Sequence, residues 1–203
     1  MLSDKPTLTG DRVVLRPVAP EHVDGLWDLV RDPETRRLTG SQGEGDFTYE
    51  AAAAWYATRA GHDDRLDLAI CDAASGAYVG EVVLNELDAG NLACNLRIAL
   101  VGPRAYGKGY GTEALRLVLA HAFETVGLHR VGLEVYAFNT RALHVYEKIG
   151  FVREGIRRDA LLWDGHWHDA IAMSILAPDW HAHHDGAAQA VHEKEPLTDV
   201  TCV

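Results

Sequence analysis

The stretch from Ile98 to Phe123 reads IALVGPRAYGKGYGTEALRLVLAHAF, and it decides the fold. The apolar run from Leu96 to Val101, broken only by Arg97, predicts a strand, and a glycine-rich loop follows it. From about Thr112 apolar residues recur at helical spacing, namely Ala114, Leu115, Val118, Leu119, Ala122, Phe123 and Val126. A strand, a glycine loop and a helix in this order can hold a phosphate group. The first amides of a helix lack internal partners and carry partial positive charge.

Three glycines at positions 107, 109 and 111 remove side chains that would keep a phosphate away from the backbone. Arg104 and Lys108 add positive charge to the loop, and Thr112 can cap the helix. The segment from Gly102 to Lys108 nearly matches the P-loop of nucleotide-binding proteins. Gly109, however, stands where that motif needs the hydroxyl that holds Mg²⁺. The glycines also lack the G-x-G-x-x-G spacing of a dinucleotide turn, so both kinds of ligand are disfavoured.

The composition sets further limits. The chain of 203 residues suits one domain, and its hydrophobic content of 47% suffices for a core. The formal net charge of −11 argues against non-specific nucleic-acid binding. The first residues lack the apolar core of a secretory signal, and no apolar run is as long as a membrane span. Cys71, Cys94 and Cys202 are odd in number and lack metal-binding spacing, which indicates reduced thiols. We therefore expect a cytoplasmic protein with neither a membrane nor a nucleic-acid partner.

The rest of the chain predicts alternating strands and helices. Strands are expected over residues 12–18, 66–71, 78–87, 128–138, 151–163 and 166–175, and helices over 21–31, 49–60 and 140–148. Turns at Ser75-Gly76 and Asp164-Gly165 predict two hairpins. The central strand, the central helix and the strand over 128–138 predict a β-α-β unit with parallel strands. We expect the domain to span residues 8–180, with a disordered tail over 181–203.

A second motif follows the glycine loop after one predicted helix and one predicted strand. Residues 139–151 read NTRALHVYEKIGF. With the R-x-x-G-x-G spacing of Arg104, Gly107 and Gly109, this block resembles the GCN5-related N-acetyltransferases, the GNAT superfamily. The segment DAIAMS at 169–174 resembles the subgroup that acetylates the N-termini of ribosomal proteins, and the related polyamine acetyltransferases.

The resemblance implies one α/β (α+β) domain with a strongly twisted mixed sheet of about seven strands, four flanking helices and splayed central parallel strands. It also implies acetyl-CoA as co-substrate, no metal, and direct acetyl transfer to a primary amine. The residues that it implies for acetyl-CoA are Ile98, Ala99, Leu100, Arg104, Gly107, Lys108, Gly109, Tyr110, Gly111, Thr112, Asn139 and Tyr146. Tyr146 aligns with the tyrosine that protonates the CoA thiolate. A phenol with a pKa of about 10 is neutral at pH 7 and can donate that proton.

The general base is left open. Asn95 occupies a strand position where many relatives carry a carboxylate, and an amide cannot take a proton, so a water held by Asn95 is one alternative. Glu44 and Asp46 lie where the polyamine acetyltransferases keep an acidic base, and they are also explained as polar loop residues. Arg97 is unusual at its place and faces either an acidic acceptor or solvent. Glu81 is interpreted as structural.

Two rival functions are considered. One is a non-catalytic acyl-CoA-binding or sensor module on the same fold, and the other is a phosphate-binding NTPase, which Gly109 disfavours. The histidines lack cysteine or carboxylate partners at ligand spacing, so no metal site is predicted; the ones considered are His166, His168, His181, His183 and His184. The acceptor stays open among a protein N-terminus, a polyamine, an aminoglycoside-like antibiotic and an amino acid. A homodimer is suggested by the resemblance alone.

Overall fold

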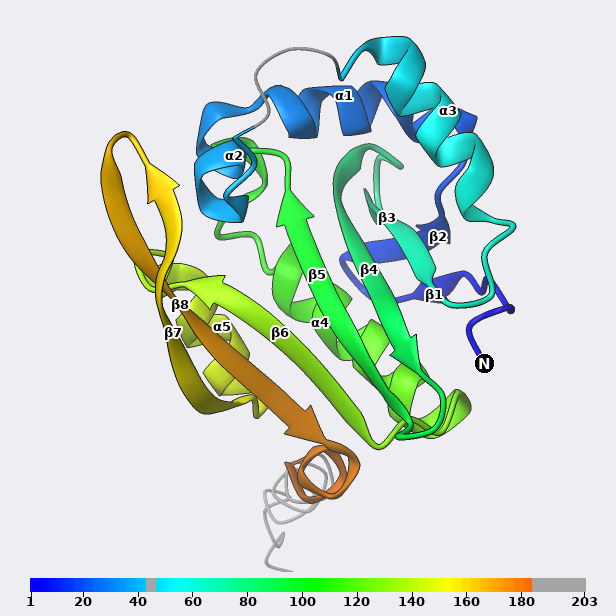
Figure 1. Ribbon diagram of the computed structural model, residues 1–203. Helices are drawn as coiled ribbons and strands as arrows, with labels where there is room; N and C mark the ends of the chain where they lie inside the picture. Colours follow the sequence, from blue (N-terminus) through cyan, green and yellow to red (C-terminus); the bar gives the residue numbers. More distant parts are fainter. Residues whose placement is uncertain (43–46, 184–203) are drawn as a thin grey trace, which may run out of the picture.

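The computed structural model describes residues 1–42 and 47–183 and shows one eight-stranded sheet (Figure 1). The strands are β1 (Leu8–Thr9), β2 (Val13–Pro17), β3 (Leu66–Asp72), β4 (Tyr78–Asp88), β5 (Ala93–Leu100), β6 (Arg130–Tyr136), β7 (Val152–Trp163) and β8 (His166–Leu176). Their order in the sheet is β1-β2-β3-β4-β5-β6-β8-β7. All neighbours are antiparallel except β5 and β6, so the predicted parallel β-α-β unit is confirmed.

Helices cover both faces of the sheet. The five α-helices with defined bounds are α1 (Val23–Arg31), α2 (Pro33–Thr39), α3 (Tyr49–Arg59), α4 (Tyr110–Ala120) and α5 (Thr140–Ile149). Short helical turns are η1 (Pro20–His22), η2 (Pro103–Ala105) and η3 (His121–Thr125), the last a π-type turn that continues α4. In Figure 1, α4 and α5 lie behind the sheet, while α1 to α3 lie above the ends of β3, β4 and β5.

Two hydrophobic cores hold these layers together. The larger core joins α4 and α5 to the sheet, and buried side chains such as Leu115 and Ile149 belong to it. The smaller core joins α1 and α3 to the other face through residues such as Leu26, Ala69 and Val101. The apolar stripe predicted for the central helix is thus confirmed as its buried face. Within the described ranges, no helix is both long and apolar enough to cross a membrane.

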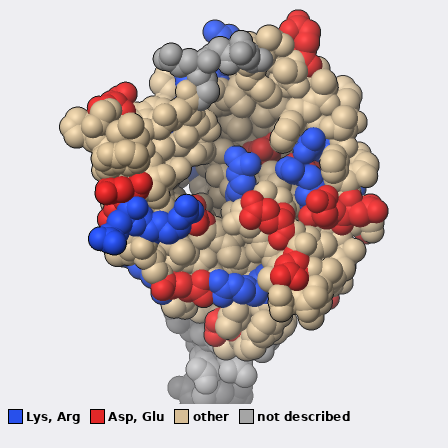
Figure 2. Space-filling view, viewed as in Figure 1, with Lys and Arg blue, Asp and Glu red and all other residues tan. Residues whose placement is uncertain are grey.

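The two central strands separate soon after they meet. β5 and β6 pair at only three positions, Ala93 with Arg130, Cys94 with Val131, and Asn95 with Gly132. Beyond Asn95, β5 continues for five residues beside β4, and no strand of the described residues pairs with its other edge. The space-filling view shows a hollow between the β7–β8 hairpin and the rest of the molecule, on the face drawn in Figure 1 (Figure 2). The splayed strands expected from the family resemblance are therefore present.

The structure corrects two details of the prediction. The sheet has eight strands instead of about seven, because the short β1 adds to the edge of β2. The helix α2 was not predicted, although Asp32 ends α1 and also begins α2 by accepting a hydrogen bond from the Thr35 amide at 2.7 Å. Pro33 occupies the first helical position, where its missing N–H costs nothing. Glu44, Asp46 and residues 184–203 of the predicted tail lie outside the described residues.

Candidate active site

The glycine loop leads into α4 without a side-chain cap. The helix begins at Tyr110, so the prediction of a start at Thr112 with Thr112 as its cap was wrong. Gly109 is the N-cap residue instead, with φ of 83°, and it has no side chain that could accept a helix amide. Gly107 also has a positive φ, of 72°. The first amides of α4 therefore remain available for an external anion.

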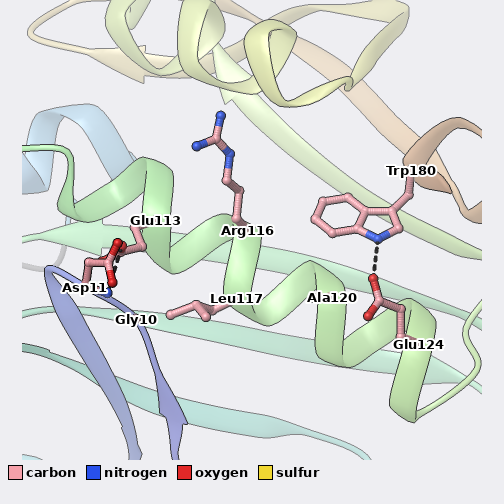
Figure 3. Close-up of a pocket in the computed structure, with 8 residues that line it drawn as sticks. All are labelled: Gly10, Asp11, Glu113, Arg116, Leu117, Ala120, Glu124 and Trp180. Atoms are coloured by element: carbon pink, nitrogen blue, oxygen red, sulfur yellow. Dashed lines mark hydrogen bonds between the residues drawn. The ribbon is translucent and has the colours of Figure 1, made fainter. Parts of the chain in front are cut away.

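The Glu113 side chain of α4 fixes the position of this helix start. The Glu113 carboxylate accepts hydrogen bonds from three successive amides, those of Asp11, Arg12 and Val13, at 3.1, 2.8 and 2.8 Å. Figure 3 shows Glu113 pointing at this turn before β2. The groove drawn there continues along the outer side of α4 to Trp180, whose indole donates to Glu124 at 3.0 Å. This groove lies on a different side of α4 from the gap between β5 and β6.

The charges beside the loop differ from those predicted. The Arg104 guanidinium pairs with Asp28 of α1 at 2.8 Å, so it is turned away from the loop. Arg12 lies closer, because its side chain is 3.3 Å from the place where a Cβ on Gly109 would stand, and it donates to the Lys108 carbonyl at 3.5 Å. Arg12 and Lys108 line a cavity of about 340 Å³ that also includes Tyr110. Arg12 was not predicted to lie here, because it is distant from the loop along the chain.

Backbone groups of β5 face the gap between the central strands. The Val101 amide donates to Val79 of β4 at 2.9 Å, whereas the Leu100 carbonyl points the other way and accepts from the Thr35 hydroxyl at 3.0 Å. Because backbone groups alternate along a strand, those of Ile98 also face the gap. Those of Ala99 face β4, where Glu81 is its cross-strand partner. Of the three residues predicted to bind the acyl-CoA arm, Ile98 and Leu100 thus direct their amides to the gap, and Ala99 directs its amide to β4.

Tyr146 and Asn139 lie at opposite ends of α5. The Tyr146 side chain is 7% exposed, its ring is 5.7 Å from that of Phe151, and burial raises its pKa to about 12. Its hydroxyl has no hydrogen-bond partner among the described residues. The Asn139 side-chain oxygen accepts from the Ala142 amide at 3.2 Å and caps the helix as predicted. Its side-chain NH₂ group remains able to donate.

Asn95, considered above in place of a general base, makes a structural hydrogen bond through its side-chain amide. Its side-chain NH₂ donates to the Asn85 side chain of β4 at 3.1 Å. On the same sheet face Glu81 accepts a hydrogen bond of 2.6 Å from the hydroxyl of Tyr56, and that hydroxyl is hydrogen-bonded to Tyr78 at 3.0 Å. Burial raises the pKa of Glu81. Sequence analysis missed the special environment of Glu81, since it depends on two tyrosines from α3 and β4.

An aromatic wall closes the far side of the gap. The rings of Tyr136 and Phe138 stack at 5.6 Å, and His168 of β8 meets Phe138 edge-on at 5.0 Å. The Arg37 guanidinium of α2 lies 4.6 Å from the Phe138 ring, and Gln42 donates to the Leu162 carbonyl of the β7–β8 hairpin. The segment after α1 and the β7–β8 hairpin therefore meet across the end of the gap.

Neither described cysteine is suited to nucleophilic catalysis. Cys71 and Cys94 are both buried and unpaired. Burial raises the pKa of Cys94 to about 12, which keeps the thiol protonated at neutral pH. Among residues 1–42 and 47–183, no three His, Cys, Asp or Glu side chains gather in a way that could hold a metal ion. The site thus offers backbone amides, a phenol and a carboxylate.

Comparisons with known proteins identify the family. Residues 12–152 match the model of the acetyltransferase (GNAT) domain, and the chain therefore belongs to the GNAT family of acetyltransferases. The Probable N-acetyltransferase YjcK of Bacillus subtilis (strain 168) is 34% identical over 124 residues, which are 61% of this chain and 68% of that protein. The [Ribosomal protein uS5]-alanine N-acetyltransferase of Escherichia coli (strain K12) is 33% identical over 88 residues, which are 43% of this chain and 45% of that protein.

A solved structure agrees with the fold. The spermidine N-acetyltransferase of Vibrio cholerae, in complex with CoA and spermine, is 23% identical and superposes with a TM-score of 0.75. The match covers 84% of this chain and 99% of that chain, and it shows the fold. The alignment with the Escherichia coli uS5-alanine enzyme spans less than half the length of that relative. The chain therefore contains an acetyltransferase domain of the GNAT type.

Proposed function

We propose that this chain transfers the acetyl group of acetyl-CoA directly to a primary amine that enters beside β5. The observation that carries the proposal is the gap after the third β5–β6 pair, which leaves the backbone groups of Ile98 and Leu100 unpaired with any strand. The pantetheine arm of CoA has amides of its own and can pair with these groups like an added strand. The uncapped start of α4 lies at the end of the same strand and suits the diphosphate.

The glycine loop and its neighbours hold the nucleotide end. We propose that the amides after Gly109 bind the diphosphate and that Arg12 and Lys108 supply the nearby positive charge. The remaining predicted loop contacts, from Gly107, Tyr110, Gly111 and Thr112, stay part of this proposal. Arg104 contributes only after it leaves Asp28. Binding CoA far from its thioester orients the reacting carbonyl, an effect worth at most about 7–11 kcal/mol of barrier.

The chemical step needs a neutral amine and a proton for the departing sulfur. The amine nitrogen attacks the thioester carbon, the C–N bond forms, and the C–S bond breaks. The amine loses one proton, and the CoA thiolate gains one from the Tyr146 hydroxyl. The raised pKa of Tyr146 keeps that proton on the phenol until the thiolate forms beside it. The protonated, buried thiol of Cys94 supports direct attack without an acyl-enzyme.

Glu81 is our proposed acceptor of the amine proton. Its carboxylate lies on the sheet face opposite α4, next to Ala99 of the central strand, and Ala99 is too small to screen it. Other carboxylates described on this face, Glu134 and Glu154, are paired with Arg157 and Arg130. Asn95 then has a positioning role, because its hydrogen bond to Asn85 joins β5 to β4. Glu44, predicted as a base, stays a prediction because it lies outside the described residues.

The acceptor class and the setting of the enzyme are also proposals. The named relatives act on a ribosomal-protein alanine and on spermidine, and both substrates present an amine. We propose a small-molecule or peptide amine for this chain, a cytoplasmic location and a possible function as a homodimer. Size measurement by light scattering, with and without CoA, tests the dimer.

One experiment separates an enzyme from a sensor module. Calorimetry with acetyl-CoA measures binding, and a thiol-release assay measures turnover with an amino acid, an alanine-starting peptide, spermidine and an aminoglycoside. We expect binding, and release of CoA with at least one amine class. Binding without release for every class would favour the non-catalytic alternative. No binding by folded protein would refute the proposed function.

A further inference from the structure

Arg97 carries a positive charge that has no ion-pair partner among the described residues. It lies on the sheet face opposite α4, which we call the open face. It is exposed and lies on β5 directly before Ile98, whose backbone faces the gap. Its cross-strand partner is Val83, so its side chain shares the sheet face of Glu81 and Asn85 and points away from the α4 core. In the described part of the chain, Arg97 has neither an ion pair nor a hydrogen bond.

Three other arginines around this face are each paired with a nearby carboxylate. Arg65 binds Asp67 at 2.6 Å, Arg130 pairs with Glu154, and Arg157 pairs with Glu134. The carboxylates of these three pairs are therefore already occupied and do not form a surface that attracts a polycation. This contrasts with the strongly acidic chain as a whole. The described part of the open face instead presents Arg97, with Arg37 at the aromatic wall.

Glu81 is the diagonal neighbour of Arg97. Glu81 lies opposite Ala99 and Arg97 lies two residues before Ala99, so the two Cα atoms are roughly 7–8 Å apart, as for any diagonal pair in an antiparallel sheet. The two side chains do not form an ion pair, although the charge of Arg97 opposes the effect of burial on the pKa of Glu81. The positively charged Arg97 and the carboxyl group of Glu81 are therefore close but not in contact. A molecule that carries one negative and one positive charge can bind between them.

We infer that the acceptor is an α-amino acid, whose carboxylate binds the Arg97 guanidinium while its amine faces Glu81 and the thioester. An arginine binds a carboxylate through parallel hydrogen bonds and so fixes its orientation. The adjacent positive charge also favours loss of the ammonium proton, because it disfavours a second cation nearby. A polyamine would meet the same charge as repulsion. The inference rests on the proposed function, since it names the acceptor of that site.

The test compares acceptors that differ only in the carboxylate. CoA release is measured with the twenty common L-amino acids, with the methyl esters of those that react, and with spermidine. We expect at least one free amino acid to exceed its ester by about tenfold or more in kcat/KM, the usual worth of a charged hydrogen bond. Esters or spermidine that react as well as the free acids would overturn the inference.

Variants assign the effect to Arg97. Arg97→Gln should raise KM for the amino acid about 10- to 100-fold, leave acetyl-CoA affinity unchanged and abolish the preference over the ester. Arg97→Lys should restore part of the preference. Arg16→Gln is the matched control, since Arg16 is an exposed arginine on the same sheet face but on β2, three strands from β5. An equal change in Arg16→Gln, or none in Arg97→Gln, would contradict the assignment.

The result in which no amino acid releases CoA also tests the inference. Thermal shift and calorimetry with the same amino acids, in the presence of CoA, report binding without turnover. If acetyl-CoA binds but no amino acid binds or reacts, the inference is wrong while the proposed function stands. If acetyl-CoA itself does not bind, the proposed function fails first.

Discussion

The hydroxyl of Tyr110 donates a hydrogen bond of 2.6 Å to the carboxylate of Asp72. Tyr110 is the first residue of α4 and Asp72 is the last of β3, so the bond fastens the start of the helix to the sheet edge. Glu113 makes a second attachment to the amides before β2. The helix start that we assign to the diphosphate is therefore held in place before any ligand arrives.

The Tyr110–Asp72 bond should be visible as a pH effect. The hydrogen bond from Tyr110, helped by Ser75, lowers the pKa of Asp72 to about 2 from its ordinary 3.8. A lowered carboxyl pKa adds stability above the ordinary value, and this is lost as pH falls toward 2. Tyr110→Phe should therefore melt earlier than wild type at pH 7, and the gap between the two proteins should close in acid. Thermal melts over this range measure it; a gap that does not change with pH would contradict the prediction.

Two glycines with the same backbone geometry separate strain from binding. Gly107 in the loop and Gly76 in the β3–β4 turn have φ of 72° and 73°, and a Cβ on either would meet nothing within 4 Å. Alanine at either place should cost about 1–2 kcal/mol of stability. Only Gly107→Ala should weaken acetyl-CoA binding, by about tenfold if the loop shifts to relieve the strain. Chemical denaturation and calorimetry give both numbers, and equal affinity in the two variants would count against the loop as the diphosphate site.

Removing the Tyr146 hydroxyl should slow turnover more than it weakens binding. Tyr146→Phe keeps the packing against Phe151 but removes the proton donor. Proton transfer by a positioned side chain contributes about 10²–10⁴-fold, so kcat should fall within that range while acetyl-CoA affinity changes little. Stopped-flow thiol release and calorimetry measure the two effects. An unchanged kcat would exclude Tyr146 from the chemical step.

Glu81→Gln tests the proposed proton acceptor. Burial raises the pKa of Glu81 above its ordinary 4.5, so wild-type turnover should rise with pH through that raised value and Glu81→Gln should lose this limb. Groups that face Glu81 are Tyr56 of α3, Tyr78 of β4, Arg97 of β5, Asp67 of β3, and Arg65 directly before β3. Tyr56→Phe removes a donor to the ionised form and should move the limb to higher pH.

Stability gives an independent check on Glu81. A carboxyl with a raised pKa binds more protons in the folded than in the unfolded state, so its contribution falls as pH rises from 4.5 through the raised pKa. The melting temperature of Glu81→Gln relative to wild type should therefore increase across this window. A parallel pH dependence in both proteins would show that Glu81 has an ordinary pKa.

Local patterns were enough to predict the central elements of the fold. The apolar run of β5, the stripe of α4 and the turn at Asp164-Gly165 each follow from residues near one another in the chain, and each is present. The start of α4 was misplaced because Thr112 is a good cap in isolation, whereas Gly109 ends the loop with a backbone shape that glycine adopts readily.

The charged contacts could not be predicted in the same way. Arg104 lies inside the motif but binds Asp28, and Arg12 lies far from the motif but reaches the loop. Both outcomes depend on how α1 and β2 pack against the sheet. The environment of Glu81 likewise comes from α3 and β4 meeting over one carboxylate. Spacing along a chain does not specify such encounters.

The three-pair contact of β5 with β6 has a consequence for the lifetime of the fold. Amide hydrogens of Ile98 and Leu100 should exchange quickly with heavy water in the free enzyme and slowly once acetyl-CoA fills the gap, because the ligand then supplies the missing acceptors. A ligand that binds the folded state alone adds about 2.7 kcal/mol at a hundred times its Kd. Acetyl-CoA would thus act as the last strand of the sheet, and its supply would govern how well the protein resists proteases as well as how fast it works.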